Sequence, residues 1–170
     1  MFARTARLLL RPGFAEDAPA LAALVADERR LRVAGAVDLD QSWALDEAAA
    51  LPMMLVIERT ATAPRLVGAC GLARLASGDV ELRLWIARRH GGRGLGGEAG
   101  TALVDIARTL GLARIDARCI DGDRASQQLL ARLGFEATGL GSDVARCTSG
   151  ALHPARVMRL NLDAKVRLAA

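Results

Sequence analysis

The sequence predicts an α/β protein of the α+β type, with a mixed, mostly antiparallel central sheet flanked by helices. Apolar segments typical of strands follow one another at residues 53–59, 66–75 and 80–86, separated only by short turns, which indicates an antiparallel meander. A glycine-rich loop comes next, and after it the hydrophobic period changes from that of a strand to that of a helix. The 170 residues contain no internal repeat and no linker, so a single domain over residues 1–170 is expected.

The N-terminal part of the chain is expected to hold one strand and two helices. Residues 6–12 form the strand, which ends at a Pro-Gly pair. This start is free of acids and rich in arginine, as a mitochondrial presequence is, but the short apolar run and the Pro-Gly pair favour a strand. Asp17 is expected to cap a helix that has Pro19 in its first turn and continues to about Glu28. A second, weaker helix is expected at residues 42–50, after a loop or short helix.

The C-terminal half alternates helices and strands. In chain order, the expected elements are a helix from Glu98 to Leu110, a strand at 114–120, a helix at 125–133, a strand beginning at Phe135 and a strand at 155–162. Gly111 supplies the stop of the first helix, and Asp123 is the expected N-cap of the second, which ends at Gly134.

Composition limits the classes of function. The net charge of +4 fits an anionic ligand, and nucleic acid is not expected because no basic stripe is interleaved with aromatic residues. The three cysteines are widely spaced and form no CxxC pair, so we expect no metal site and a reducing, cytoplasmic compartment. The most apolar run, at residues 48–57, contains Pro52 and is too short to cross a bilayer, so a soluble protein without a membrane partner is expected.

The stretch at residues 79–97, DVELRLWIARRHGGRGLGG, joins a strand to a helix through a glycine-rich loop. The glycines are Gly91, Gly92, Gly94, Gly96 and Gly97. Such a loop lets successive amides converge on a ligand, and the helix start adds its positive dipole end, so we expect a phosphate or pyrophosphate there. Arg88, Arg89 and Arg93 could add charge-assisted bonds. The alternative interpretation is a turn that needs only positive φ angles.

Two other classes of nucleotide-binding protein are excluded by context. Gly94, Gly96 and Ala99 satisfy the GxGxxA pattern of a dinucleotide-binding oxidoreductase. However, only roughly seventy residues follow, and they do not repeat a βαβ unit. A P-loop is excluded because the Gly-Lys-Ser/Thr ending is missing.

The segment GGRGLGGEAGTALVDIARTLGLARIDARCIDGDRASQQLLARLGF resembles the cofactor-binding half of the GNAT acetyltransferases. The start TARLLLRPGFAEDAPAL resembles the N-terminus of the branch that contains the ribosomal-protein alanine N-acetyltransferases. Together they cover most of the chain except about residues 26–50. The resemblance implies a GNAT-like domain that moves an acetyl group from acetyl-CoA to a primary amine, of a protein N-terminus or a small molecule, by direct attack in a ternary complex. It also implies that sheet edges can pair two copies into a homodimer.

The resemblance places a set of cofactor-binding residues on this chain. They are Ile86, Gly92, Arg93, Gly94, Leu95, Gly96, Gly97, Asp123 and Ser126. The amides from Gly92 to Gly97 would surround the pyrophosphate, and the backbone of Ile86 would meet the pantetheine and acetyl group. The sequence departs from the family at Gly91, where a Gln or Arg is usual, and Arg93 could partly take over that electrostatic role. In the Asn-x-x-Ser motif Asp123 replaces Asn, which keeps an acceptor but loses an amide donor.

Catalysis needs a base, because an ammonium must lose its proton before it attacks a thioester. Many relatives carry a glutamate on this strand, and Glu81 matches by its position relative to the loop. The alternative bases are Asp79 and Asp121. Glu81 could instead be an exposed strand carboxylate paired with Arg83 or another neighbour. A strand amide near Ile86 would polarise the carbonyl oxygen.

The general acid of many relatives is a tyrosine four residues after the position of Ser126. That position is Leu130, and the chain contains no tyrosine, so the tyrosine mechanism is excluded. Ser126, Cys119, His153 or a water could act instead, or no acid is needed.

In this family the choice of the amine acceptor usually depends on a variable region, which here covers about residues 26–50. Its acids, Asp38, Asp40, Asp46 and Glu47, could attract a cationic amine or could be solvated helix ends. The missing tyrosine, Gly91 and Asp123 also leave open a second function, a non-catalytic module that binds acyl-CoA as a sensor or partner.

Overall fold

A computed structural model describes residues 2–30, 51–138, 143–146 and 152–162. The strands are β1 (Ala3–Arg4), β2 (Leu8–Arg11), β3 (Met53–Glu58), β4 (Arg65–Arg74), β5 (Val80–Ile86), β6 (Arg114–Ile120), β7 (Glu136–Ala137), β8 (Asp143–Arg146) and β9 (Leu152–Asn161). The helices are α1 (Ala18–Arg30), α3 (Leu95–Thr109) and α4 (Arg124–Arg132), with short 3₁₀ turns at Ala15–Asp17 and Arg88–His90.

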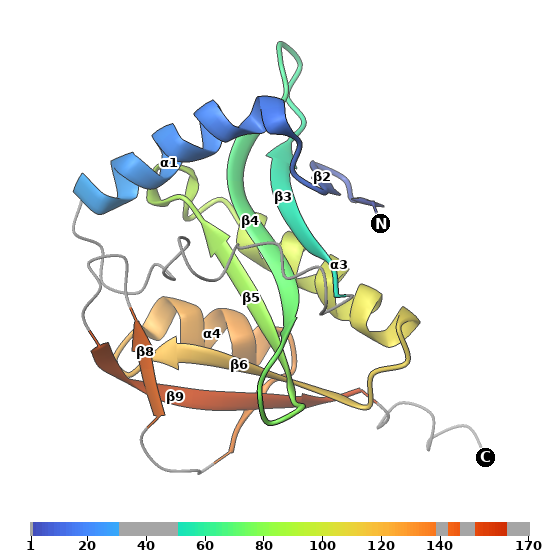
Figure 1. The fold of residues 1–170 in the computed structure, drawn as a ribbon, viewed down its shortest axis with the longest axis vertical. Helices are drawn as coiled ribbons and strands as arrows, with labels where there is room; N and C mark the ends of the chain where they lie inside the picture. Colours follow the sequence, from blue (N-terminus) through green and yellow to red (C-terminus); the bar gives the residue numbers. More distant parts are fainter. Residues whose placement is uncertain (1, 31–50, 139–142, 147–151, 163–170) are drawn as a thin grey trace.

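The described strands form one sheet in the order β1-β2-β3-β4-β5-β6-β9-β7, and β8 pairs with β9. All described pairs are antiparallel except β5 with β6, which run parallel and meet in register only at Glu81 and Asp116. Beyond that pair the two strands diverge, as Figure 1 shows. The sheet is therefore open between β5 and β6 on the side where β5 leads into the glycine loop.

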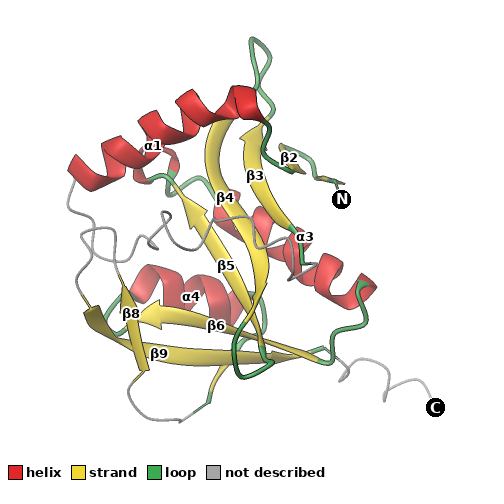
Figure 2. Cartoon of the chain, viewed as in Figure 1, coloured by secondary structure: helices red, strands yellow, loops and turns green. Residues whose placement is uncertain are grey.

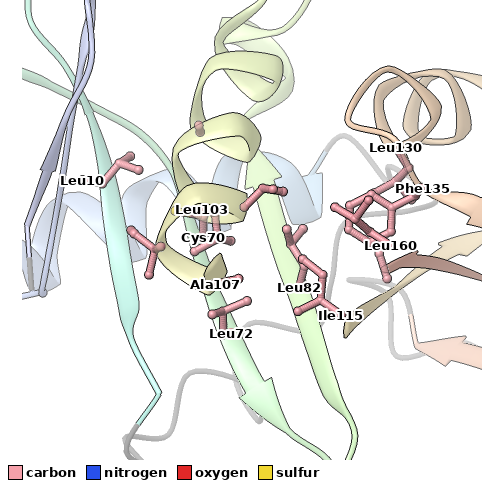
Figure 3. Packing of buried hydrophobic residues seen from close by; sticks show 14 of the residues in the cluster. Leu10, Cys70, Leu72, Leu82, Leu103, Ala107, Ile115, Leu130, Phe135 and Leu160 are labelled. Atoms are coloured by element: carbon pink, nitrogen blue, oxygen red, sulfur yellow. The ribbon is translucent and has the colours of Figure 1, made fainter. Parts of the chain in front are cut away.

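Helices cover both faces of the sheet (Figure 2). Side chains alternate along β5, so Leu82 faces the α3 side and Trp85 faces the α1 side. Leu103 and Ala107 of α3 lie close to Cys70 and Leu72 of β4 (Figure 3). A smaller apolar cluster beneath α1 contains Leu24, Leu55, Ile57, Ala69, Trp85 and Ala87.

Helices α3 and α4 approach each other closely because glycines occupy their contact. A Cβ added at Gly96 or Gly97 would lie 3.4 or 3.8 Å from the Leu129 side chain, and one at Gly100 would lie 2.6 Å from Leu133. Glycine lowers helix propensity, but here the absence of a side chain makes room for Leu129 of α4 and for Leu133, its C-cap. The glycines of the loop thus also pack the two helices.

The predicted meander is confirmed, since β3, β4 and β5 pair in succession. Helix α3 begins at Leu95 rather than at Glu98, because Gly96 and Gly97 form its first turn instead of extending the loop. Strand β9 begins at Leu152, three residues earlier than expected. The sequence did not predict the short strands β1 and β8. The expected helix at residues 42–50 lies outside the described residues.

Asp17 does not cap α1 in the way the sequence suggested. Its carboxylate accepts a hydrogen bond from the amide of Phe14 at 2.8 Å, which closes the 3₁₀ turn before the helix. It also accepts two bonds from the Arg11 guanidinium, at 2.6 and 2.7 Å. Those bonds hold the pKa of Asp17 below its usual range. The acid therefore fastens β2 to the turn that leads into α1.

Candidate functional site

The glycine loop runs from the end of β5 to the first turn of α3. Two of its glycines need a conformation that other residues rarely adopt, with φ of +72° at Gly92 and +76° at Gly94. Gly91 has an ordinary φ of −67°, and Gly96 and Gly97 are helical. The turn interpretation therefore accounts for only two of the five glycines.

Six consecutive backbone amides of the loop are available to a ligand. The amide of Gly91 donates to the carbonyl of Arg88, but within the described residues the amides of Gly92, Arg93 and Gly94 have no acceptor. The next three amides, from Leu95 to Gly97, belong to the first turn of α3 and lack intrahelical partners. Donors at the positive end of a helix suit a phosphate or pyrophosphate.

Arg93 is bound to a buried glutamate that the sequence did not reveal as its partner. Its Nη1 donates to Oε2 of Glu58, at the end of β3, over 3.0 Å, and its Nη2 contacts Oε1. These bonds hold the pKa of Glu58 below its usual range, against the opposing effect of burial. The role predicted for Arg93 at the pyrophosphate is thus shared with an ion pair inside the protein. Arg89, also expected near the anion, contacts Asp27 of α1.

The N-terminal segment anchors the loop from its other side. The amide and Nε of Arg7 donate to Glu98, in the first turn of α3, at 2.8 and 2.7 Å. Thr5 donates to the same carboxylate, and Arg7 Nη1 donates to the carbonyl of Arg93 at 2.9 Å. Burial acts to raise the pKa of Glu98, but the bonds from Thr5 and Arg7 outweigh it, and the pKa lies below its usual value. The loop is therefore fixed to the turn between β1 and β2 as well as to β3.

Glu81 lies on β5, on the face opposite α3, in the strand that precedes the loop. The residue is 8% exposed, so it is not the exposed carboxylate of the alternative interpretation. Its Oε2 accepts from Nη1 of Arg118 at 2.5 Å, and its Oε1 lies 3.5 Å from Nε of Arg83. The predicted pairing with a neighbour is therefore present.

The two alternative bases are also paired. Asp79 accepts from Arg114 at 2.6 Å and from Ser77 at 2.9 Å, and these bonds lower its pKa. Asp121 is exposed and pairs with Arg156 at 3.0 Å. Of the three candidates, Glu81 is the most deeply buried.

Asp123 and Ser126 form two hydrogen bonds with each other at the start of α4. Oδ1 of Asp123 accepts from the amide of Ser126 at 3.1 Å, and Oδ2 accepts from its hydroxyl at 2.6 Å. The predicted N-cap is confirmed. The two carboxylate oxygens each already accept one of these bonds, so a cofactor would meet a formed cap.

The candidate general acids fall into different environments. Ser126 donates its hydroxyl proton to Asp123. Cys119 is buried on β6, and burial raises the pKa of its thiol. The side chain of His153 lies outside the described part of the structure. Leu130, at the family's tyrosine position, is buried and clusters with Phe135 and Leu160 (Figure 3).

One buried donor lacks a partner near this site. Nε1 of Trp85 is the only buried side-chain nitrogen or oxygen among the described residues without a hydrogen bond. Trp85 is 7% exposed and shares the face of β5 that carries Glu81 and Arg83. A buried donor without a hydrogen bond is unfavourable by about 1–3 kcal/mol, so an acceptor atom of a ligand would bind favourably at this nitrogen.

The described residues hold no group of three or more His, Cys, Asp and Glu side chains that could bind a metal ion. None of the described helices has both the length and the apolar character needed to span a membrane.

Comparisons with known proteins agree on one family. The model described as "Acetyltransferase (GNAT) domain" matches residues 7–136. An acetyltransferase from Agrobacterium tumefaciens is 25% identical, with a TM-score of 0.72, and the match covers 95% of this chain and 94% of that one. No curated protein matches the sequence.

Two of the similar solved structures are ribosomal-protein acetyltransferases. The ribosomal-protein-S5-alanine acetyltransferase from Vibrio fischeri is 16% identical, with a TM-score of 0.76, and the match covers 96% of this chain and 97% of that one. RimL, a ribosomal L7/L12 α-N-protein acetyltransferase solved with coenzyme A, is 17% identical, with a TM-score of 0.77, and coverage of 96% and 99%. At these identities the likeness concerns the fold.

Proposed function

This chain belongs to the GNAT acetyltransferase family, and from that premise we propose that it transfers the acetyl group of acetyl-CoA to a primary amine by direct attack in a ternary complex. The acceptor is the N-terminus of a protein or a small amine. The observation that carries the proposal is the juxtaposition of six available amides, from Gly92 to Gly97, with the opening between β5 and β6.

The loop residues fit the cofactor as hydrogen-bond donors. The amides of Gly92, Arg93, Gly94, Leu95, Gly96 and Gly97 would hold the pyrophosphate, and the positive end of α3 adds to the attraction. Ile86, the last residue of β5, would present its backbone to the pantetheine arm and the acetyl carbonyl. Asp123 and Ser126 would border the cofactor through the start of α4. Bound acetyl-CoA supplies the thioester carbonyl that the amine attacks.

Glu81 is the residue proposed to take the proton of the amine, directly or through a water. Its position on β5, five residues before Ile86 and on the face opposite α3, supports this role. Arg118 and Arg83 contact the carboxylate and would fix its orientation. A thiolate leaving group needs no dedicated acid, which accords with Leu130 at the tyrosine position.

The proposal also includes the domain bounds, the cellular compartment and the oligomeric state of the protein. We place a single GNAT-like domain at residues 1–170, working in the cytoplasm, where the free thiols of Cys70 and Cys119 would stay reduced. A homodimer formed through sheet edges is part of the proposal, and light scattering on the purified protein tests it.

One observation favours a second candidate function, a non-catalytic acyl-CoA sensor or partner module. Glu81 has two arginine partners, which a free base would not need. Such a module would bind acetyl-CoA but transfer nothing, and the variant Glu81→Gln would behave as wild type.

The first experiment is a calorimetric titration with acetyl-CoA, with NADH as the control ligand, at two salt concentrations. We expect acetyl-CoA alone to bind, more weakly at high salt because the loop binds an anion. A transfer assay on N-terminal peptides and small amines then compares Glu81→Gln with Asp116→Asn, which removes a similarly buried and paired carboxylate next to it. We expect kcat to fall about 10²–10⁴-fold only in Glu81→Gln. Binding of NADH alone would overturn the interpretation of the loop.

A further inference from the structure

The face of β5, β6 and β9 opposite α3 carries a layer of ion pairs, most of which join neighbouring strands. The pairs are Glu81 with Arg118 and Arg83, Asp116 with Arg159, and Asp79 with Arg114. The acids lie deeper than the bases: the side chains of Glu81 and Asp116 are 10% and 11% exposed, whereas Arg118 and Arg159 are 30% and 29% exposed. In these two pairs the guanidinium groups are therefore nearer to solvent than the carboxylates.

The arginines of this layer differ in how they are bound. Among the described residues, four arginines lie close to three carboxylates. Asp116 and Arg159 form a bidentate pair with two bonds of 2.7 Å, and Arg114 and Arg118 each donate a short hydrogen bond to a carboxylate. Arg83 differs from them, because it only approaches Glu81, at 3.5 Å, and within the described residues its guanidinium makes no hydrogen bond.

A second donor without an acceptor lies on the same strand face. Trp85, two residues beyond Arg83, is 93% removed from solvent and its Nε1 has no partner. Side chains two apart on a strand share a face and lie about 6.5–7 Å apart. Among the described residues, this strand face therefore carries two groups, the Arg83 guanidinium and Nε1 of Trp85, that have no hydrogen-bond acceptor.

The guanidinium of Arg83 lies beside the proposed transfer site. Arg83 stands on β5 between Glu81, the proposed base, and Ile86, the residue proposed to meet the acetyl group. An amine that hands its proton to Glu81 would bring the atoms next to it within reach of the Arg83 guanidinium. A planar guanidinium binds a carboxylate through two parallel bonds, which gives both affinity and orientation.

We propose that Arg83 recognises a carboxylate carried by the acceptor close to the amine that is acetylated. The inference rests on the proposed function and names the class of its acceptor. The carboxylate is that of a free amino acid or an acidic side chain within the first residues of a peptide. Glu81 and Arg83 would then hold the two ends of the same short acceptor segment.

The test compares acceptors that differ only in charge near the amine. Three peptides with a free N-terminal alanine carry Asp-Asp, Asn-Asn or Lys-Lys at their second and third positions, and free alanine is compared with alanine amide. We expect the acid-bearing peptide, or the free amino acid, to have a KM at least about tenfold lower than its neutral counterpart, with kcat little changed. A preference among the peptides would identify an acidic side chain as the source of the carboxylate, and a preference for alanine over alanine amide would identify a free amino acid.

The variant Arg83→Gln should reduce this preference for acidic acceptors to less than about threefold. Arg83→Lys should retain part of the preference, because lysine keeps the positive charge but cannot donate the two parallel hydrogen bonds of a guanidinium. Arg114→Gln is the matched control, an arginine of the same face paired with Asp79 at the far end of β6. It should leave the preference intact. Circular dichroism checks that every variant is folded. If Arg83→Gln does not fold, the preference for acidic acceptors is measured with Arg83→Lys instead.

Peptide binding to the CoA-loaded protein, measured by calorimetry, separates this inference from the proposed function. If the protein binds and transfers acetyl groups without preferring acidic acceptors, or if the preference persists in Arg83→Gln, the inference is overturned and the proposed function stands. If acetyl-CoA does not bind, the proposed function fails, and the same titrations on the unliganded protein then decide the inference. Equal binding of the acidic and neutral peptides overturns it in that case also.

Discussion

Arg93 links the glycine loop to the sheet through Glu58, a carboxylate that is almost entirely buried. The pairing keeps the pKa of Glu58 below its value in the unfolded chain. A group with a depressed pKa stabilises the fold at pH values above its unfolded pKa, and this contribution is lost as the pH falls through its folded pKa. The ion pair is therefore a source of stability at neutral pH and not in acid.

We expect Arg93→Gln to lower the free energy of unfolding at pH 7, because Glu58 is left buried without its strongest partner. The difference from wild type should shrink in acid, once the pH has fallen through the lowered pKa of Glu58 and the carboxyl group is protonated in both proteins. Urea denaturation at the two pH values measures it. Arg108→Gln, which removes an exposed pair with Asp105, should change stability by less than about 0.5 kcal/mol. A deficit that is the same at both pH values would contradict this account of Glu58.

Gly68 of β4 packs tightly against the backbone at the end of β5. A Cβ at this residue would lie 2.1 Å from the carbonyl oxygen of Trp85 and 2.9 Å from Cα of Ile86, and backbone atoms cannot rotate away. Gly68→Ala should therefore lose about 1–3 kcal/mol of stability. It should also weaken acetyl-CoA binding, because the displaced strand carries Ile86. Gly13→Ala, whose Cβ would meet Leu55 at an ordinary 3.6 Å, is the control in thermal melts and titrations. Equal melting temperatures for both variants would refute the crowding.

Helix α4 depends on a single residue for its N-terminal cap. Asp123→Ala should cost about 1 kcal/mol, since the amide of Ser126 loses its acceptor. Asp123→Asn keeps that acceptor and should stay within a few tenths of a kcal/mol of wild type. The asparagine also restores the amide donor that the family uses, so acetyl-CoA should bind it at least as tightly. Thermal melts and calorimetry measure both effects, and a loss of stability in Asp123→Asn equal to that in Asp123→Ala would show that charge matters more than the cap.

The elements that the sequence predicted well are those with a clear period or an unambiguous stop signal. The meander of β3, β4 and β5 and the cap of α4 belong to this group. The start of α3 was placed too late because Gly96 and Gly97 have poor helix propensity, whereas their contacts with Leu129 favour the helix. Two strands, β1 and β8, are too short to show a period.

The glycine loop of the candidate site was predictable from the sequence, whereas its long-range ion pairs were not. Glycine spacing between a strand and a helix located the loop amides, because both flanking elements are local in sequence. The partners of Arg93 and Glu98 are 35 and 91 residues away, and only the sheet order brings them together. The same applies to Arg118, which reaches Glu81 across the parallel β5–β6 pair. A sequence contains no local signal for such contacts.

At the scale of the whole molecule, the loop is connected to the N-terminal part of the sheet and to helix α4, so a ligand bound there should stabilise the entire domain. Arg93 ties the loop to β3, Glu98 ties it to the turn between β1 and β2, and Leu129 of α4 packs on Gly96. A ligand that binds only the folded state adds about 2.7 kcal/mol at one hundred times its Kd. For a domain of this size that corresponds to a rise in Tm of about 5–10 °C.

Thermal unfolding with and without acetyl-CoA therefore tests the single domain and its ligand together. We expect one transition, displaced upward as a whole by acetyl-CoA and left in place by NADH. The displacement should be smaller in Gly94→Ala at equal ligand, because a side chain there strains a residue with φ of +76° among the free amides. It should be preserved in Arg83→Gln, whose side chain lies on the other face of β5. Two separate transitions, only one of which responds to acetyl-CoA, would mean that the loop and the remainder of the chain fold as independent units.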